Sequence, residues 1–151
     1  EREGVRYIDD SISTTPVSVA AALETIGFDD VVLLLGGMDR GLEWDTFAAG
    51  VADYLPHAII TLPDNGAKIF ASLERAGLEP AGGLHQAENL ASAVTLAREL
   101  VPEGGCVLLS PGAPSFPHFR DYADRGKRFN ALSGIEKHVP STHKKEPRDR
   151  G

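Results

Sequence analysis

Short, continuous apolar runs recur along the chain, and each is followed by a turn and then by a segment with helical periodicity. Val31–Leu35, Ala58–Leu62 and Val107–Leu109 are runs of this kind, and Gly, Pro, Asp or Ser follows each of them. Strands that alternate with helices form parallel sheets through βαβ units. An unbroken apolar run also indicates a strand that is covered on both faces. We therefore predict an α/β fold in which a mostly parallel sheet lies between two layers of helices.

The same patterns predict the remaining elements. Val5–Ile8 reads as a further strand, and Gly83–His85 as a weak strand at an edge of the sheet. Thr15 is suited to cap a helix that begins at Pro16. Helical periodicity predicts helices at Pro16–Ile26, Trp44–Leu55, Asn65–Ala76, Asn89–Leu100 and Phe119–Leu132.

Composition indicates one soluble globular domain. The chain has 151 residues, of which 42% are hydrophobic and 25% are charged. Past Gly134 the sequence changes to Lys, His, Pro, Arg and Ser, with almost no apolar residues. Such a segment cannot bury enough surface to offset its ordering entropy. We expect a domain at residues 1–134 and a flexible tail at residues 135–151.

Charge and spacing exclude several classes of partner. The net charge of -7 would repel a nucleic-acid backbone, and no apolar stretch approaches the roughly 20 residues that cross a membrane. The single cysteine, Cys106, lies in an apolar run, so we expect a reduced thiol and a cytoplasmic protein. The five histidines lack metal-ligand spacing, and no nucleophile motif is present. We expect no metal site and no catalytic residue in this chain.

The candidate ligand-binding segments are the loops that follow the predicted strands, because open α/β sheets bind ligands beyond the carboxyl ends of their strands. The first, Asp9–Pro16, combines two carboxylates with four hydroxyls before a helix. It is suited to dock an anion, with Asp9 or Asp10 on a ribose hydroxyl or a magnesium-bound water. The alternative is ordinary helix capping by Ser13, Thr14 or Thr15.

The second loop, Gly36–Gly41, is rich in glycine but lacks the Gly-Lys-Ser/Thr sequence of a phosphate-binding loop. It presents Arg40 at a tight turn, which suits a bidentate grip on a carboxylate. The alternative is that Asp39 and Arg40 pair with each other.

The third loop, Ser110–Phe116, contains two prolines and a glycine that fix its backbone path. It either aims the Ser115 hydroxyl at a ligand or serves as a stiff connector. The segment Phe119–Gly126 carries charges with aromatic residues spaced by three, a pattern typical of a solvated helix face over a core stripe.

Taken in this order, the loops resemble those of the Mur ligase family. The resemblance spans roughly residues 5–134, and its carriers are Asp10–Thr14, Gly36–Gly41, Ser110–Phe116, Phe119, Arg125-Gly126 and Phe129. It implies a three-layer α/β/α Rossmann-like sandwich with a six-stranded sheet, five strands parallel and one antiparallel. It also implies the C-terminal, amino-acid-binding domain of a three-domain enzyme, whose N-terminal and central ATPase domains are absent from this chain.

The resemblance implies an ATP-dependent ligase of the bacterial cytoplasm that adds glutamate to UDP-N-acetylmuramoyl-L-alanine in peptidoglycan synthesis. ATP and Mg2+ would be bound mainly by the central domain, so this chain alone is expected to be monomeric and inactive. The family favours D-glutamate, and L-glutamate is the alternative. A second alternative is a non-catalytic module that binds a nucleotide or another ligand.

The resemblance also assigns a glutamate pocket. Thr14 and Ser115 would hydrogen-bond the carboxylates of the incoming glutamate. Arg40 stands where a basic residue grips the side-chain carboxylate, and Phe116 and Tyr122 would complete the pocket.

The nucleotide side of the site is assigned in the same way. Asp10 would lie near the ATP ribose, with Ser11 beside it. Many family members carry lysine where this chain has Ile12. An aliphatic side chain cannot replace an ammonium group, so that contact is lost or is supplied elsewhere.

Overall fold

A computed structural model of the chain describes residues 4–116 and 118–134. Within these residues, five strands form one sheet. The expected tail at residues 135–151 lies outside the described residues. The strands are β1 (Arg6–Asp9), β2 (Val31–Leu35), β3 (Ala58–Thr61), β4 (Leu84–Gln86) and β5 (Cys106–Leu109). The helices are α1 (Pro16–Ile26), α2 (Asp45–Val51), α3 (Gly66–Arg75), α4 (Leu90–Leu100) and α5 (Tyr122–Ser133), and a 3-10 turn, η1 (Ala52–Tyr54), continues α2.

Every strand pairing is parallel, and the order across the sheet is β1-β5-β2-β3-β4. In the central strand β2, Leu33 lies opposite Ile59 on one side and Leu108 on the other. The predicted weak strand is β4, at the edge beside β3. The described residues contain no sixth, antiparallel strand, so the five-stranded parallel sheet is the part of the prediction that is confirmed.

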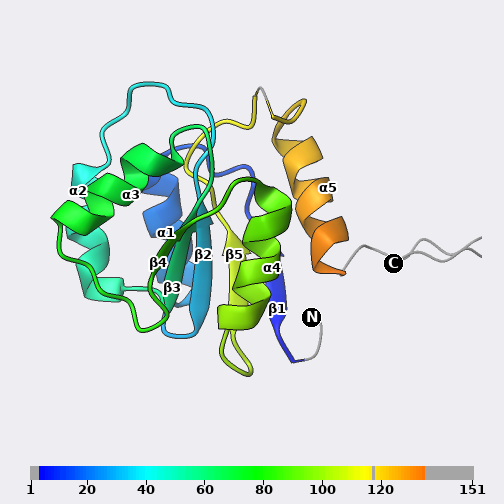
Figure 1. The fold of residues 1–151 in the computed structure, drawn as a ribbon, viewed down its shortest axis with the longest axis horizontal. Coiled ribbons are helices and arrows are strands. Elements are labelled where there is room, and N and C mark those ends of the chain that lie inside the picture. The colour runs from blue at the N-terminus through cyan, green and yellow to red at the C-terminus, as the bar shows by residue number, and fades with distance from the viewer. Residues whose placement is uncertain (1–3, 117, 135–151) are drawn as a thin grey trace, which may run out of the picture.

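Helices cover both faces of the sheet, with α1, α2 and α3 on one side and α4 and α5 on the other (Figure 1). The side chains of β2 alternate between the two cores: Leu33 and Leu35 pack with α1, α2 and α3, whereas Val32 and Leu34 pack with α4 and α5. All five residues of β2 are buried. The predicted three-layer α/β/α sandwich is therefore confirmed. None of the described helices is long and apolar enough to cross a membrane.

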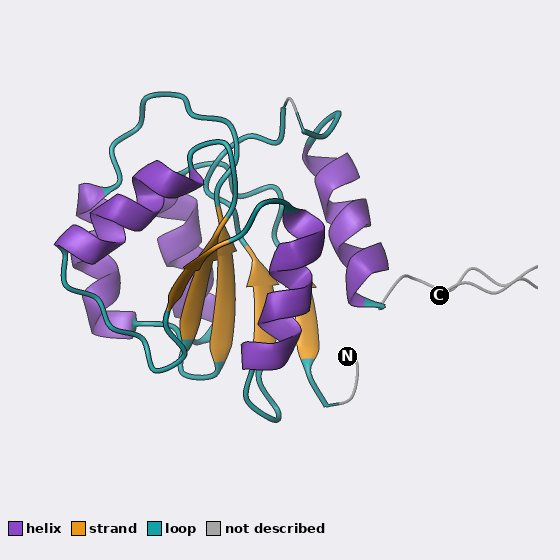
Figure 2. Cartoon of the chain, in the orientation of Figure 1, coloured by secondary structure: helices purple, strands orange, loops and turns teal. Residues whose placement is uncertain are grey.

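The topology brings three loops together at one end of the sheet. Strand β5 lies between β1 and β2. The loop after β5 leads to α5 on one face of the sheet, whereas the loops after β1 and β2 lead to helices on the opposite face. Loops that diverge in this way mark the ligand-binding position of open α/β sheets. The loops that follow β1, β2 and β5 gather at this carboxyl edge (Figure 2).

Local caps set where the helices begin. Thr15 accepts a hydrogen bond from the Ser18 amide and Ser18 accepts one from the Thr15 amide, a capping box that fixes the start of α1 as predicted. Helix α5 starts at Tyr122, three residues later than predicted, because Asp121 has an extended backbone and its side chain accepts from the Asp124 amide.

Candidate functional site

A buried guanidinium group joins the loops at the carboxyl edge. Arg125 projects from α5 and is 1% exposed. Its Nε donates to Ser11 Oγ (2.8 Å), its Nη2 to the Ser11 carbonyl (2.8 Å) and its Nη1 to the Ala113 carbonyl (2.9 Å). These acceptors are neutral, and burial lowers the pKa of Arg125 to about 10, an effect that Asp9 partly opposes. Arg125 therefore ties the loop after β1 to the loop after β5.

Direct backbone contacts join the loop after β2 to the same assembly. Gly36 donates its amide to the Pro111 carbonyl (2.8 Å), and Met38 donates its amide to the Pro114 carbonyl (2.9 Å). A Cβ atom on Gly37 would lie 2.5 Å from the Pro114 carbonyl oxygen and 3.2 Å from Arg125 Nη1. Glycine is required at position 37 because the two loops approach this closely.

The loop after β1 is ordered by its own polar groups. One oxygen of Asp10, Oδ2, accepts from the hydroxyls of Ser13 and Ser110. Its other oxygen, Oδ1, has no hydrogen-bond partner in the described part of the chain. Ser11 is 3% exposed, and its hydroxyl accepts from Arg125 and donates to the Tyr122 carbonyl (2.8 Å). Asp10 thus keeps one oxygen available for a ligand, while Ser11 holds the loops together.

Arg40 is exposed and lies beside Thr14. Its Nη2 donates to the Thr14 carbonyl (3.1 Å). Asp39 pairs with Lys68 (3.2 Å) and accepts from the Gly41 amide (2.9 Å), and both contacts lower the pKa of Asp39. The alternative pairing of Asp39 with Arg40 is therefore wrong. Within residues 4–116 and 118–134, no carboxylate pairs with the remaining N–H groups of Arg40, which can therefore bind a ligand.

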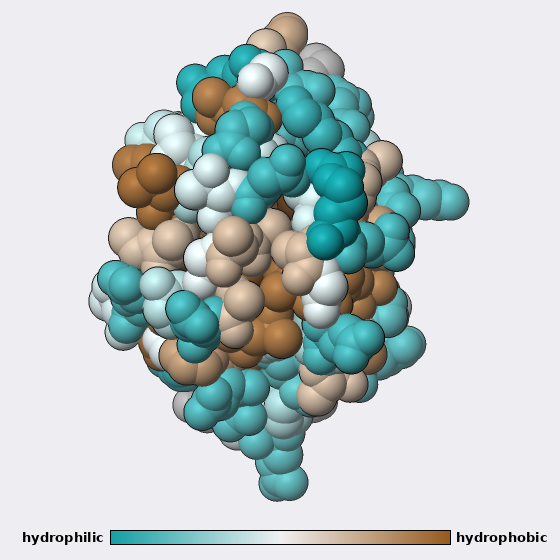
Figure 3. Space-filling model, turned by 90° about the vertical axis from the view of Figure 1, so that its left-hand side faces the viewer, coloured by the Kyte–Doolittle hydropathy of each residue, from teal (hydrophilic) through white to brown (hydrophobic). Residues whose placement is uncertain are grey.

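The residues assigned to the glutamate pocket do not all lie in one cavity. Arg40 lines a hollow of about 650 Å³ between α1 and α2, on the face where Figure 3 shows gathered apolar side chains. Ser115 lines a second cavity of about 410 Å³ on the α4 and α5 side. Phe116 and Tyr122 are 61% and 48% exposed, respectively. The structure thus places Thr14 with Arg40, and Ser115 apart from them in the second cavity.

Metal-ligating side chains are not grouped at this edge. Among residues 4–116 and 118–134, no three His, Cys, Asp or Glu side chains lie close enough together to hold a metal ion. One carboxylate oxygen of Asp10 accepts from two serine hydroxyls, and His118 is paired with Asp64 (2.9 Å).

Relatives match almost the whole chain. It is 47% identical over 135 residues to the UDP-N-acetylmuramoyl-L-alanine--L-glutamate ligase of Xanthomonas campestris pv. campestris, which covers 89% of this chain and 29% of that protein. The ligase of the same name from Xylella fastidiosa is 45% identical over 146 residues, 94% of this chain and 31% of that protein. The chain matches a Mur ligase domain. The resemblance inferred from the three loops is thereby confirmed.

A more distant relative of this Mur ligase domain is the UDP-N-acetylmuramoylalanine--D-glutamate ligase of Symbiobacterium thermophilum, 38% identical over 130 residues, 86% of this chain and 28% of that protein. The chain spans less than a third of the length of these relatives. No family model matches it.

The central residue of this Mur ligase domain's site, Arg125, was not recognised from the sequence as a buried group. The interpretation of Phe119–Gly126 as a solvated face holds for Arg120, which is exposed, but is wrong for Arg125 and Gly126, which are both buried. The sequence does place Arg125 four residues before Phe129, on the same stripe of the helix, and this spacing could have indicated that Arg125 faces the core.

Proposed function

We propose that this chain is the C-terminal, amino-acid-binding domain of an ATP-dependent ligase that adds glutamate to UDP-N-acetylmuramoyl-L-alanine. The observation that carries the proposal is the match of nearly the whole chain, at 47% identity, to a ligase whose name describes this reaction. The meeting of the three resembling loops at the carboxyl edge supports it. The intact ligase would be a monomer in the bacterial cytoplasm, and the sugar nucleotide would bind to the remaining part of the polypeptide.

The chemistry would be acyl-phosphate ligation. ATP phosphorylates the alanyl carboxylate, the glutamate amine attacks the acyl phosphate, and the tetrahedral intermediate expels inorganic phosphate. This domain would contribute positioning of the amine, which is worth several kcal/mol when reactants are held in near-attack geometry. Mg2+ would neutralise phosphate charge from a site in the rest of the ligase, because the described residues hold no metal-ligand cluster. The free Oδ1 of Asp10 would reach the ATP ribose.

Glutamate would be held by its charges. Among the described residues, the exposed Arg40 guanidinium donates one hydrogen bond, to the Thr14 carbonyl, and its other donors would grip the side-chain carboxylate. The Ser115 hydroxyl and the Thr14 side chain would bind carboxylate oxygens, with Phe116 and Tyr122 forming the exposed wall.

We favour L-glutamate over the D-glutamate that the family resemblance implies. The relatives named as L-glutamate ligases are 47% and 45% identical to this chain, whereas the one named as a D-glutamate ligase is 38% identical. Stereochemical preference depends on the shape of the amino-acid pocket, and pocket shape is shared most closely by the more similar proteins.

The test is phosphate release by the full-length protein with UDP-N-acetylmuramoyl-L-alanine, ATP and either glutamate enantiomer. We expect kcat/KM to be higher with L-glutamate by at least about tenfold, a difference of roughly 1.4 kcal/mol in transition-state binding. A preference for D-glutamate would overturn the stereochemical proposal alone. No glutamate-dependent phosphate release with either enantiomer would favour the non-catalytic binding module.

A further inference from the structure

The exposed turn that presents Arg40 is not held by the backbone. The preceding residue Gly37 is anchored beside α3, because its amide donates to Asn65 Oδ1 (2.9 Å) and its carbonyl accepts from the Asn65 amide (3.0 Å). Asp39, Arg40 and Gly41 are exposed, and in the described part of the chain they make no backbone-to-backbone hydrogen bond with another segment. Side-chain contacts therefore set where Arg40 lies.

The Asp39 carboxylate makes two of these contacts. Its Oδ1 accepts from the Gly41 amide (2.9 Å), which closes a turn around Arg40, and from Lys68 Nζ (3.2 Å). Gly41 has a φ of 78°, a left-handed conformation that glycine adopts without strain. Because Lys68 belongs to α3, the carboxylate ties the turn to a helix.

Helix α3 is a firm support for this contact. Ile69, next to Lys68, and Leu73, one turn later, are both fully buried in the core beneath the sheet. On its other side, the Arg40 guanidinium donates to the Thr14 carbonyl (3.1 Å). Arg40 is therefore held between the loop that precedes α1 and the first turns of α3.

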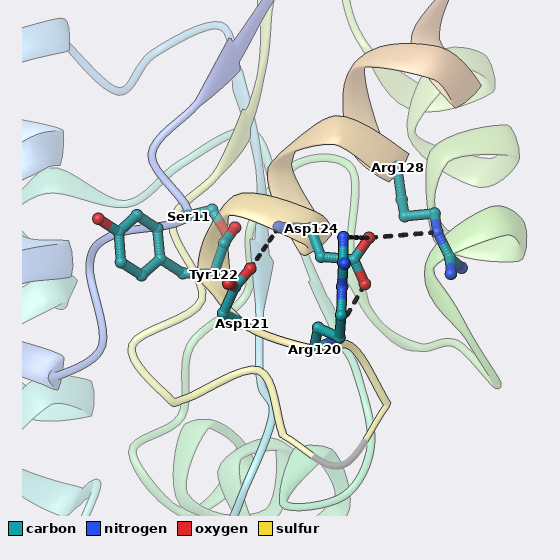
Figure 4. Close-up of polar contacts among 6 residues, drawn as sticks. All are labelled: Ser11, Arg120, Asp121, Tyr122, Asp124 and Arg128. Carbon is teal, nitrogen blue, oxygen red and sulfur yellow. Dashed lines mark hydrogen bonds and ion pairs between the residues drawn. The ribbon is translucent and has the colours of Figure 1, made fainter.

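Other exposed ion pairs provide a comparison. The Asp124 carboxylate pairs with arginines four positions before and after it in the sequence, as Figure 4 shows, so these pairs are local. The pair of Arg75 with Asp45 (2.9 Å) also starts on α3, but it leads to the first residue of α2. The pair of Lys68 with Asp39 instead holds the residue next to Arg40.

We propose that Lys68 is a positioning residue for Arg40: it holds the Asp39 carboxylate and thereby fixes the turn that presents the Arg40 guanidinium to a ligand carboxylate. The inference rests on the proposed function for the identity of that ligand, glutamate. A carboxylate next to Arg40 would also repel the ligand. Positioning and charge repulsion therefore have opposite consequences when Asp39 is removed.

The first test is the glutamate KM of the proposed full-length ligase, measured by phosphate release. Lys68→Met should raise this KM by about threefold to fivefold with kcat nearly unchanged, the size expected for an exposed ion pair. Lys68→Arg should restore most of the loss, because arginine keeps the charge and the donors. Arg75→Met, the matched control on the same helix, should change the KM by less than about twofold. An equal rise in the control would overturn the positioning role.

Asp39→Ala decides between positioning and charge. If Asp39 transmits the position of Lys68, its removal should raise the glutamate KM, even though a negative charge is lost beside the ligand. Adding Lys68→Met to Asp39→Ala should then change the KM by less than about twofold, because the two residues act as one unit. A lower KM in Asp39→Ala would show charge repulsion alone and would overturn the proposal.

Backbone 15N relaxation of the isolated chain, residues 1–151, tests the same contact without the ligase reaction. In the wild type we expect order parameters near about 0.85 for Arg40 and Gly41, and below about 0.6 in Lys68→Met. Arg75→Met should leave them unchanged. Unchanged values in Lys68→Met would overturn the positioning role whatever reaction the ligase performs. Lower values in Lys68→Met, together with no glutamate-dependent phosphate release by the wild type, would support the positioning role and refute the proposed function alone.

Discussion

Replacing Arg125 by methionine tests whether a buried charge holds the three loops together. The guanidinium donates three hydrogen bonds, two to Ser11 and one to the Ala113 carbonyl. Methionine has a similar length and fills most of the volume, so the variant removes the donors with little new cavity. The orphaned acceptors would belong to loops that follow two different strands.

Two opposing terms set the size of the effect. Hydrogen bonds to a charged group contribute about 1.5–3 kcal/mol each, so the loss of three amounts to roughly 5–9 kcal/mol. Burial opposes this, because it lowers the pKa of Arg125 to about 10, which corresponds to about 3 kcal/mol of disfavoured charge. We therefore expect Arg125→Met to destabilise the domain by about 2–6 kcal/mol, a large part of the roughly 5–15 kcal/mol that stabilises a typical domain.

Urea unfolding of the isolated chain at neutral pH measures this loss. The matched control is Arg128→Met, one helical turn further along α5, where the side chain is 61% exposed. An exposed ion pair contributes less than about 1 kcal/mol, so the control should unfold almost as the wild type does. If Arg125→Met lay within about 0.5 kcal/mol of the wild type, the guanidinium would not be holding the loops, and the reasoning would be refuted.

Three further predictions concern neighbouring groups. Gly126→Ala should destabilise the chain by about 1–3 kcal/mol in urea unfolding, because the new Cβ would overlap the Asp9 carboxylate. If this overlap is the cause, adding Asp9→Ala to the same variant should restore part of the lost stability. Burial raises the pKa of Asp9 from 3.8, so the folded chain holds this proton more tightly than the unfolded chain does. The free energy of unfolding of the wild type should therefore fall as the pH rises from 3.8 to the higher pKa of the folded chain. Asp9→Asn, which does not titrate, should gain stability relative to the wild type over the same pH range. A series of urea unfolding curves that shows no such gain would contradict the assigned burial effect. In the proposed full-length ligase, Arg40→Ala should raise the glutamate KM about 30-fold or more with the other KM values nearly unchanged, and Arg40→Lys should recover part of this loss. An equal rise in the KM values of all three substrates would indicate a structural role for Arg40 instead.

Elements with local causes could be predicted from the sequence. Strand β2 occupies Val31–Leu35 as predicted, because a continuous apolar run specifies a strand buried on both faces. Helix α1 occupies Pro16–Ile26 as predicted, because Thr15 and Pro16 fix its first turn. Helix α5 was predicted to begin too early, since the aromatic spacing extends across the Asp121 cap.

Contacts between distant loops could not be predicted in the same way. Charged residues on a helix usually face solvent, and nothing near Arg125 in the sequence shows that Ser11, 114 residues earlier, would accept its hydrogen bonds. The partner of Asp39 is Lys68, 29 residues away, rather than the adjacent Arg40. The loops that carry the site were therefore predictable from the strand pattern, whereas the pairing of their side chains depends on which strands become neighbours.

The order of the strands also couples the loop that carries Arg40 to the loop that carries Ser115. The loop that carries Arg40 is bonded to the loop that carries Ser115 through the Met38 amide and the Pro114 carbonyl, and Arg125 holds the second loop against the first strand's loop. Arg125 is thus a positioning residue for the proposed glutamate pocket. Loosening it with Arg125→Lys, which keeps the charge but cannot span both loops, should lower the stability of the isolated chain in urea unfolding and also raise the glutamate KM of the proposed full-length ligase. Arg40→Ala should raise the glutamate KM with a much smaller loss of stability, because it removes one exposed hydrogen bond, to the Thr14 carbonyl, and leaves the contacts of Arg125 intact.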